Sequence, residues 1–558
     1  MSPVLAALAC FVLYFVVYRF YARFLGRRIF ALDPAAQTPA HLMNDGVDYV
    51  PCRKSILFGH HYASIAGLAP MLGPAIAVIW GWLPGMLWVV FGTLFIGAAH
   101  DFGALVVSMR NRGMSIGKVA EDLIGARAKA IFLLIILFLI CIVMGVFIRT
   151  VAGLFTAAYY PESVFPTFFL IFVAMVVGWL VYKRNANVST LTFIGFALMI
   201  ASIWAGLVMA KPDLGFDVWV YLLLAYAFAA SVLPVWLLLQ PRDYLNSMLL
   251  YLGLGLAYIG FFVLGPAFAA PAVNAQPADA PPIFPFVFIV IACGAVSGFH
   301  GLVSSGTTSK QIDKETDAVP IGYGGMIGES LLGLMAVLAC TAGFSSPEGW
   351  QEHYASWTSA DTLAGKMKAF IDGAATFVTA LGVPMEVAQA LIALVAVSFA
   401  LTSIDSGTRL LRYNIEEIAS SVGANFIERY SSSMIAVALI GFFAFYEING
   451  QPAGLALWSL FGSTNQVLGA LTLLTVVVYL RRRGANYWPY FIPMAFMMVV
   501  TFTAMVIDLG NYWRSGNMLL TFVAACIFAL SIWLAIEAYL RIRKDSVQSP
   551  LAAPAEGD

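Results

Sequence analysis

Charged residues are scarce in this sequence of 558 residues. Only 11% are Asp, Glu, Lys or Arg, whereas 61% are hydrophobic, and the mean hydropathy is +0.86. Lys plus Arg equals Asp plus Glu at 30 each, so no net charge attracts the chain to nucleic acid. No polar stretch is long enough to fold as a soluble domain. The composition therefore excludes a nucleic-acid-binding protein and predicts a polytopic membrane protein.

Cysteines and recognisable catalytic motifs are also few. The six cysteines are scattered and form no C-x-x-C pair, so neither a disulfide framework nor a metal site is predicted. No G-x-S-x-G elbow is present, and His300 with Ser304 or Glu329 shows no convergent nucleophile and base. We expect no enzyme and no cofactor other than a coupling ion. A membrane sensor is the other alternative, but it would need a soluble output domain.

Long apolar runs recur along the whole chain. The first has no basic segment before it and two arginines at its far end, which predicts a spanning helix rather than a cleaved signal peptide. A span needs about 20 apolar residues. The sequence thus predicts an all-α protein with about fifteen transmembrane helices, at about 2–24, 60–82, 84–109, 130–158, 166–182, 189–210, 217–239, 247–268, 283–304, 321–343, 385–404, 432–447, 454–480, 487–508 and 517–540.

The basic residues predict the orientation. With the N-terminus outside and the spans alternating, 25 of the 30 Lys and Arg residues fall at inside positions. Outside loops hold only Lys211, Lys366, Lys368 and Arg514, and Arg149 lies within a helix. Cytoplasmic loops of membrane proteins carry the excess of Lys and Arg. We therefore expect the N-terminus outside and the C-terminus in the cytoplasm.

Residues 58–85 combine an apolar run with helix-breaking residues. The stretch contains Gly67-Leu68-Ala69-Pro70 and Gly73-Pro74. Proline removes a backbone donor, and an unwound backbone survives at membrane depth only where it is buried or lines a cavity. Broken helices of this kind hold substrates and ions in transporters. A broken helix and a kinked helix without a ligand are both consistent with this stretch alone.

Ionisable residues within the predicted spans are functional candidates, because charge is costly in a bilayer. Seven of the eight lie in the predicted cytoplasmic half of their helices, and a Ser/Thr run at 304–308 lies at the same depth. Scattered structural residues would have no reason to share one depth. The eight are His60, His61, His100, Asp101, Arg149, His300, Glu329 and Asp405.

Two segments of the chain lie outside the predicted spans. The outside connection 344–384 contains an amphipathic run from Lys366 to Leu381, which we expect to lie on the surface as a helix. The tail after Lys544 is short and contains Pro and Ala, and we expect it to be disordered.

Long motifs in fixed order resemble one family. They include FGHHYASIAG (58–67), ACGAVSGFHGLVSSGTTSKQI (292–312), IGYGGMIGES (321–330) and DSGTRLLRYNIEE (405–417). These stretches are similar to the carbon starvation protein A family of bacterial inner-membrane transporters, and the resemblance covers roughly residues 15–510. That family is associated with uptake of pyruvate and peptides. The resemblance implies a multi-pass inner-membrane transporter with a LeuT-type core of five plus five helices.

The resemblance places the broken stretch 60–82 as the first core helix. It makes 217–239 the sixth core helix, interrupted at 231–234, and 283–304 the eighth. We therefore expect an N-terminal helix and cytoplasmic linker (1–57), a ten-helix transport core with two broken helices (58–425), accessory helices (426–544) and a tail (545–558). The expected partners are a small-molecule substrate and the lipid bilayer; the oligomeric state is not predicted.

The broken helices suggest a substrate site and two coupling schemes. Half-helix N-termini suit a carboxylate, and the predicted substrate residues are Ala66, Gly67, Leu68, Ala69, Tyr226, Ser231 and Trp236. In a sodium scheme, which the resemblance implies, the first and eighth helices provide oxygens. The residues are Ser64, Ser304, Ser305, Thr307 and Thr308. In a proton scheme, which we favour, titratable groups act, namely Glu329, His300 and Asp101.

Overall fold

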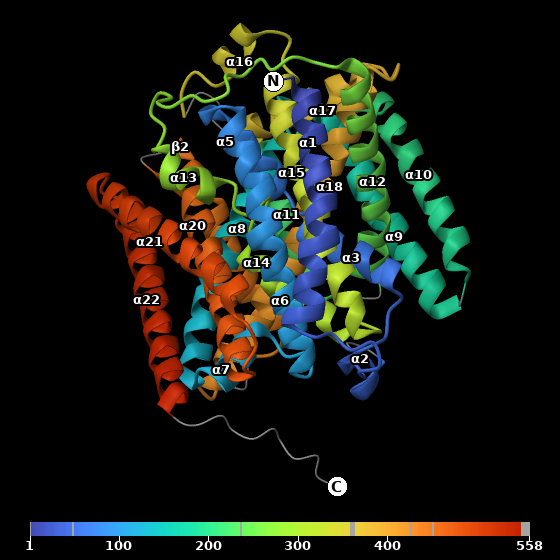
Figure 1. The fold of residues 1–558 in the computed structure, drawn as a ribbon. Helices are drawn as coiled ribbons and strands as arrows, with labels where there is room; N and C mark the ends of the chain where they lie inside the picture. The colour runs from blue at the N-terminus through green and yellow to red at the C-terminus, as the bar shows by residue number, and fades with distance from the viewer. Residues whose placement is uncertain are drawn as a thin grey trace.

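The computed structural model describes residues 2–46, 49–184, 186–234, 237–357, 363–424, 427–448, 451–452 and 454–547. Its long helices run mostly along one axis, which is close to vertical in Figure 1. The chain begins at the top of this view with α1, and α22 ends at the bottom. The two ends of the described chain therefore lie at opposite ends of the bundle.

The first half of the chain contains helices α1 (Pro3–Val17), α2 (Pro39–Leu42), α3 (Lys54–Ile65), α4 (Ala69–Ala77), α5 (Trp82–Leu87), α6 (Ala98–Arg110), α7 (Ile116–Leu123), α8 (Ala126–Leu154), α9 (Val164–Arg184), α10 (Val188–Val208), α11 (Phe216–Val232) and α12 (Leu239–Leu264). A π-helical stretch (Trp88–Gly97) joins α5 to α6.

The second half contains α13 (Ile283–Val290), α14 (Gly298–Gly306), α15 (Gly324–Ala342), α16 (Pro347–His353), α17 (Leu363–Thr379), α18 (Met385–Ser421), α19 (Arg429–Ala444), α20 (Gly454–Arg482), α21 (Trp488–Arg514) and α22 (Met518–Val547). Strands β1 (Glu447–Ile448) and β2 (Gln451–Pro452) form an antiparallel pair.

Eleven helices in the described chain are long and apolar enough to cross a membrane, and a twelfth span results if the bent pair α3–α4 counts as one. The predicted number of about fifteen is therefore not confirmed. The remaining apolar runs coincide with helices that are too short by themselves. These are α11 and α19, and the run near 283–304, which divides into α13 and α14.

The break between α3 and α4 lies where the sequence predicts it. The two helices meet at 45°, and Ala66 leaves the helical conformation with φ −77° and ψ 60°. Pro70 lies in the first turn of α4, where its missing N–H costs no hydrogen bond. The amides of Met71 and Leu72 then donate to the carbonyl of Leu68 and begin the new helix.

The second break lies between α13 and α14. Residues 291–297 are buried and not helical. Two of their carbonyls accept hydrogen bonds from side chains of the π-helical stretch: Trp88 donates to Ile291 (3.3 Å) and Thr93 to Gly294 (3.2 Å). Asn465 of α20 accepts from the Phe299 amide at 3.0 Å. These bonds replace those that an intact helix would make.

The predicted interruption at 231–234 is not a break within one helix, and this prediction is wrong. α11 ends at Val232 and a separate helix, α12, begins at Leu239. Arg409 of α18 fixes the end of α11 by donating to the carbonyls of Ala230 (2.6 Å) and Leu233 (2.7 Å). Pro234 follows directly, and a helix rarely continues into a proline.

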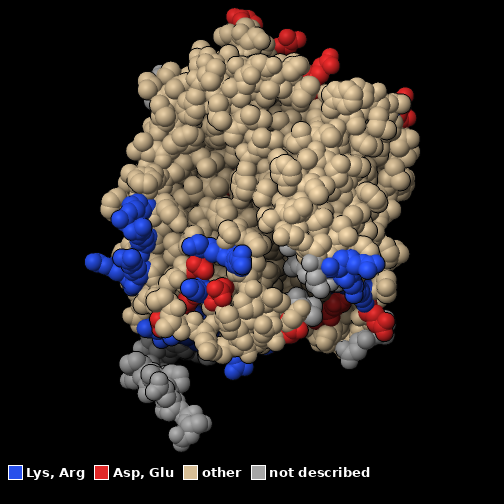
Figure 2. All heavy atoms as spheres, turned by 90° about the vertical axis from the view of Figure 1, so that its right-hand side faces the viewer, with Lys and Arg blue, Asp and Glu red and all other residues tan. Residues whose placement is uncertain are grey.

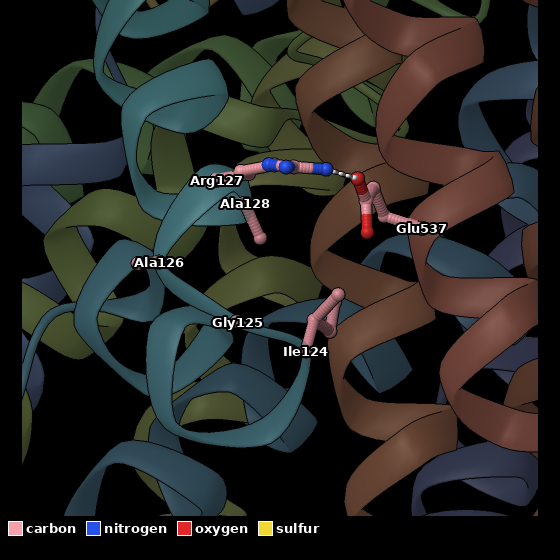
Figure 3. Close-up of a pocket in the computed structure, with 6 residues that line it drawn as sticks. All are labelled: Ile124, Gly125, Ala126, Arg127, Ala128 and Glu537. Carbon is pink, nitrogen blue, oxygen red and sulfur yellow. Dashed lines mark hydrogen bonds and ion pairs between the residues drawn. The ribbon is translucent and has the colours of Figure 1, made fainter. Parts of the chain in front are cut away.

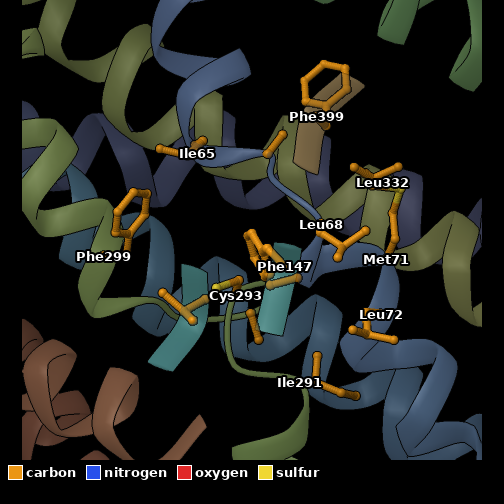
Figure 4. Packing of buried hydrophobic residues seen from close by; sticks show 14 of the residues in the cluster. Ile65, Leu68, Met71, Leu72, Phe147, Ile291, Cys293, Phe299, Leu332 and Phe399 are labelled. Carbon is orange, nitrogen blue, oxygen red and sulfur yellow. The ribbon is translucent and has the colours of Figure 1, made fainter. Parts of the chain in front are cut away.

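Apolar side chains pack tightly around both breaks. Figure 4 shows Leu68 and Met71 from the first break beside Ile291 and Cys293 from the second, with Phe147 of α8 between them. Gly67 allows the closest approach, because a Cβ at this position would lie 2.2 Å from Ser403 Oγ of α18. Because residue 67 has no side chain, the first break can pack directly against α18.

The run from Lys366 to Leu381 does not form a surface helix, so that prediction is wrong. It belongs to α17, which is buried along most of its length and packs against α12, α15 and α18. Asp372 of α17, partly exposed, accepts from Tyr160 (2.7 Å) and Gln389 (2.8 Å). A Cβ at Gly373 would lie 2.2 Å from the Ala339 carbonyl oxygen of α15.

Charged side chains separate along the bundle axis. On the face shown in Figure 2, the Lys and Arg side chains lie in the lower half, and the upper end shows only Asp and Glu. The middle of this face is almost free of charge. An apolar belt with basic residues towards one end is what a membrane protein presents to a bilayer.

The close packing at Gly67 predicts the effect of a single methyl group. We expect Gly67→Ala to destabilise the protein by about 1–3 kcal/mol, because the new Cβ displaces the Ser403 hydroxyl. Ser403→Ala alone should be nearly silent, and Gly67→Ala/Ser403→Ala should recover most of the lost stability. Thermal unfolding of the purified protein in detergent measures all three. Equal stability of Gly67→Ala and the wild type would contradict the packing of the break against α18.

Candidate functional site

Two buried polar clusters lie on either side of the half-helix α3. The acid–histidine cluster consists of His100 and Asp101 of α6, His300 of α14 and Glu329 of α15. The arginine cluster consists of Tyr226 of α11, Arg242 and Asn246 of α12, and Ser398, Thr402 and Asp405 of α18. Both contain charged side chains in the interior of a bundle of apolar helices, where such groups are costly and most often functional.

The acid–histidine cluster is centred on Asp101. One carboxylate oxygen lies 2.7 Å from His100 Nδ1, and the other lies 3.1 Å from His300 Nδ1. All three side chains are fully buried. Asp101 thus fixes both imidazole rings through their Nδ1 atoms, and the two Nε2 atoms have no hydrogen-bond partner.

Glu329 is the fourth residue of this cluster, but no hydrogen bond fixes its side chain. Its Oε2 lies 3.3 Å from His300 Nδ1, but not in hydrogen-bonding geometry, and neither carboxyl oxygen has a hydrogen-bond partner. The side chain is fully buried. Buried polar groups are nearly always satisfied, so an orphaned carboxyl beside a histidine is an exception that suggests a role in proton or ion transfer.

The predicted Ser/Thr run divides between different neighbours. Thr308 Oγ1 lies 2.9 Å from His61 Nδ1 of α3. Ser305 donates to the Gly301 carbonyl and accepts from the Ile116 amide, so it ties α14 to α7. Ser304 is buried with no partner for its hydroxyl, and Thr307 is half-buried.

Ser64, the remaining predicted coupling residue, bonds within its own helix. Its hydroxyl donates to the His60 carbonyl at 2.8 Å. The hydroxyls of Ser64, Ser305 and Thr308 therefore all have protein partners. The predicted coupling residues that lie together are Asp101, His300 and Glu329.

In the arginine cluster, a guanidinium, a phenol and a carboxylate meet in the interior. Arg242 Nη1 donates to Asp405 Oδ2 and contacts the Tyr226 hydroxyl, which in turn donates to the same carboxylate oxygen at 2.8 Å. Arg242 Nη2 donates to the Ser398 carbonyl at 3.2 Å. Asn246 donates to Thr402 Oγ1 at 2.7 Å. The side chains of Arg242 and Asp405 are only 1% and 2% exposed.

Consecutive histidines on α3 face the two clusters. His60 Nδ1 lies 3.3 Å from Asp243 Oδ2, next to Arg242, whereas His61 contacts Thr308, next to α14. Successive residues of a helix point about 100° apart, which explains how neighbours reach opposite sides. Gly325 makes room for His61, since a Cβ there would lie 2.9 Å from the ring. A shift of α3 would therefore alter contacts of both clusters.

The predicted substrate residues are only partly brought together. Ala66, Gly67, Leu68 and Ala69 are buried at the first break. Tyr226 belongs to the arginine cluster. Ser231 donates to the Phe228 carbonyl of its own helix, which points its hydroxyl away from a shared site. Trp236 lies outside the described residues.

The prediction from sequence missed Arg242, Asp243 and Asn246. Arg242 counts as an inside-loop residue if the next helix begins near 247, but α12 begins eight residues earlier, at Leu239. A signal was present, because the sequence Pro-Arg-Asp-Tyr-Leu-Asn interrupts an otherwise apolar region with two opposite charges. A charged pair so close to a helix start has to be tested for burial before it is assigned to a loop.

Two further kinds of candidate site are a metal centre and a surface pocket. Within the described part of the chain, no group of three or more His, Cys, Asp or Glu side chains is arranged to hold a metal ion. One pocket of about 300 Å³ lies at the lower end, between residues 124–128 and α22. Figure 3 shows Arg127 and Glu537 meeting across it, at 3.3 Å. No residue of either cluster lines this pocket.

Comparison with known proteins identifies a family and individual relatives that this chain resembles. The family "Carbon starvation protein CstA" matches residues 2–347 and 345–504. The Escherichia coli K12 protein named "Peptide transporter CstA" is 35% identical over 88% of this chain and 79% of that protein. The E. coli "Pyruvate/proton symporter BtsT" is 32% identical over 89% of this chain and 80% of that protein. These names denote transporters rather than enzymes.

A solved manganese transporter from Eremococcus coleocola aligns over 90% of this chain and 99% of its own, with 13% identity and a TM-score of 0.48. A likeness at that level carries no argument about fold or substrate. The two E. coli relatives do carry an argument about the family, because they are about one-third identical to this chain over most of its length. The expected family resemblance is confirmed, and the chain belongs to the carbon starvation protein CstA family.

Proposed function

We propose that this chain is a secondary active transporter that imports a small carboxylate such as pyruvate, or short peptides, together with protons. Its membrane is the bacterial inner membrane. The relatives named as peptide transporters and as a pyruvate/proton symporter support the substrate class. The observation that carries proton coupling is Glu329, a fully buried carboxyl with no hydrogen-bond partner beside His300.

We also propose a five-plus-five inverted repeat, with a different assignment from that expected from sequence. The first half would be α3–α4, α5–α6, α8, α11 and α12, and the second half α13–α14, α15, α18, α19 and α20. Each half then begins with a broken helix, and the two halves run in opposite directions along the axis in Figure 1. The core would extend to Arg482 rather than end at 425.

Packing contacts support this assignment because they occur in symmetric pairs. α4 packs on α15 as α14 packs on α6. α12 packs on α3 and α18 as α20 packs on α13 and α8. The central pair α8 and α18 lie against each other, as do α11 and α19. Inverted repeats of this kind place substrate and ion sites at the broken helices.

Proton coupling follows from the state of the acid–histidine cluster. Asp101 is already hydrogen-bonded to two histidines, so its position is fixed. Glu329 lacks such bonds, and among the described residues the basic side chain within 4 Å of it is His300. A buried carboxyl with a single basic group beside it changes the stability of the conformation that encloses it when it gains or loses a proton. That is the property a coupling site requires.

Sodium coupling remains as the second scheme because of one observation. Ser304 on α14 has a buried hydroxyl without a partner, which could face an ion. Two other predicted hydroxyl oxygens have less capacity for an ion, which supports the proton scheme: Ser305 accepts from the Ile116 amide, and Thr308 lies 2.9 Å from His61 Nδ1.

The orientation predicts which positions are accessible from each side. In a cysteine-free background, we expect single cysteines at Asp213 and Glu348 to react with an impermeant thiol reagent from outside the cell. Cysteines at Arg112 and Arg482 should react only after the membrane is opened, because basic loops stay in the cytoplasm. Labelling of Arg112→Cys in intact cells would reverse the proposed orientation.

Replacement of Glu329 by Gln should separate transport from coupling. Because Gln cannot exchange a proton, we expect Glu329→Gln to lose pyruvate accumulation driven by a pH gradient while retaining pyruvate exchange across proteoliposomes. Asp508→Asn is the matched control, since Asp508 is a buried carboxyl that lies on α21, outside the proposed core, and belongs to neither polar cluster; it accepts hydrogen bonds from Ser459 and Ser463 of α20.

Removal of sodium should leave wild-type uptake unchanged under the proton scheme. The scheme fails if uptake stops without sodium and Ser304→Ala reproduces that loss. It also fails if Glu329→Gln accumulates pyruvate as well as the Asp508→Asn control does.

A further inference from the structure

The arginine cluster contains more hydrogen-bonding atoms than it satisfies. Arg242 Nε, Asp405 Oδ1, Asn246 Oδ1 and Ser398 Oγ are all buried without a hydrogen-bond partner. They come from two helices that pack against each other, α12 and α18, and surround one ion pair. Buried groups of this kind are normally paired. A buried arginine with an unused donor beside an under-bonded carboxylate is poorly explained as a static link between helices.

The geometry of the pair favours exchange of the anion. Arg242 contacts only one oxygen of Asp405, although a guanidinium can bind a carboxylate through two parallel hydrogen bonds. Its other terminal nitrogen, Nη2, is spent on the Ser398 carbonyl, a weaker acceptor than a carboxylate. An incoming carboxylate could therefore bind Arg242 through two nitrogens and form a better pair than Asp405 does.

We propose that Arg242 binds the carboxylate of the transported substrate, which takes the place of Asp405. The proposal rests on the transport function proposed above and names the group that recognises the substrate. A carboxylate is the group that pyruvate and an unmodified peptide have in common. One arginine site can thus serve both kinds of substrate, and the rest of each molecule contributes only secondary contacts.

The displaced Asp405 has other partners within reach. Its Oδ2 already accepts a hydrogen bond from Tyr226 at 2.8 Å, which need not break. Arg409 lies one turn further along α18, and its buried Nε has no hydrogen-bond partner. Asp405 can therefore exchange one arginine for another, so the exchange leaves no charge without a neighbour of opposite sign.

The arginine cluster is also linked to α3, the half-helix that lies between the two clusters. Asp243 follows Arg242 in sequence and lies 3.3 Å from His60 of α3. His60 is 15% exposed, whereas Arg242 and Asp405 are almost completely enclosed. In this proposal a substrate reaches Arg242 past α3, and movement of this half-helix opens or closes the arginine to it.

The test separates carboxylate binding from a purely structural ion pair. Binding of pyruvate and of alanyl-alanine to the full-length protein in detergent is measured by isothermal titration calorimetry. Methyl pyruvate and alanyl-alanine amide, which lack the carboxylate, are the paired probes. The variants are Arg242→Gln, Asp405→Asn and the double variant, which removes both charges and so leaves neither one unpaired. The matched control is Arg110→Gln/Glu315→Gln, another partly buried arginine–carboxylate pair, joined at 2.7 Å.

We expect the double variant to fold, as judged by gel filtration and thermal unfolding, but to bind pyruvate and alanyl-alanine at least about tenfold more weakly than the wild type. Asp405→Asn should bind both more tightly, because the competing anion is gone. The control pair should retain wild-type affinity, and neither carboxylate-free probe should bind the wild type.

Two results would overturn the proposal. If the double variant folds and binds with wild-type affinity, the ion pair is only structural. The proposed transport function would still stand. Equal affinity of the wild type for pyruvate and methyl pyruvate would mean that the carboxylate is not recognised. If the wild type neither binds nor transports pyruvate or the peptide, the proposed function itself fails, and the inference fails with it.

Discussion

An unwound backbone inside a membrane protein must find all its hydrogen bonds within the protein, and this constraint organises the structure. At the second break, Trp88 and Thr93 of the π-helical stretch bond carbonyls of residues 291–297, and Asn465 of α20 bonds the start of α14, so two other elements are fixed around this break. At the first break, Gly67 allows the chain to press directly against α18. The half-helix α3 is consequently set apart from α4, and its two histidines project between the buried clusters.

The clusters divide the chemistry that import of an anion requires. Moving a bare carboxylate inward against a negative membrane potential is unfavourable, and moving it with a proton removes that cost. In our account Arg242 receives the anion and Glu329 receives the proton. The clusters make no direct contact in the described structure, but α3 touches Asp243 beside one of them and Thr308 beside the other. This half-helix is the physical connection through which occupancy of one site can affect the other.

Features with a strong local signal were predictable from the sequence. Gly67 and Pro70 mark the first break, and Asp101, His300 and Glu329 are conspicuous because they interrupt apolar runs. The second break has no proline within 291–297, and its stability comes from side chains more than 160 residues away, such as Trp458 and Asn465. Sequence alone cannot indicate such partners. Arg242 is not predicted because the true start of α12 precedes its apolar run, and the burial of α17 is not predicted because it depends on packing against the distant helices α12, α15 and α18.

The central claim, that a carboxylate and a proton enter together, is tested most directly by following protons during pyruvate entry. Proteoliposomes are prepared without sodium, the membrane potential is clamped at zero with potassium and valinomycin, and pyruvate is added outside while a pH electrode records the medium. The account predicts that the medium becomes alkaline in proportion to the pyruvate taken up. Pyruvate entry without any change in pH, or entry that begins only when sodium is added, would contradict it.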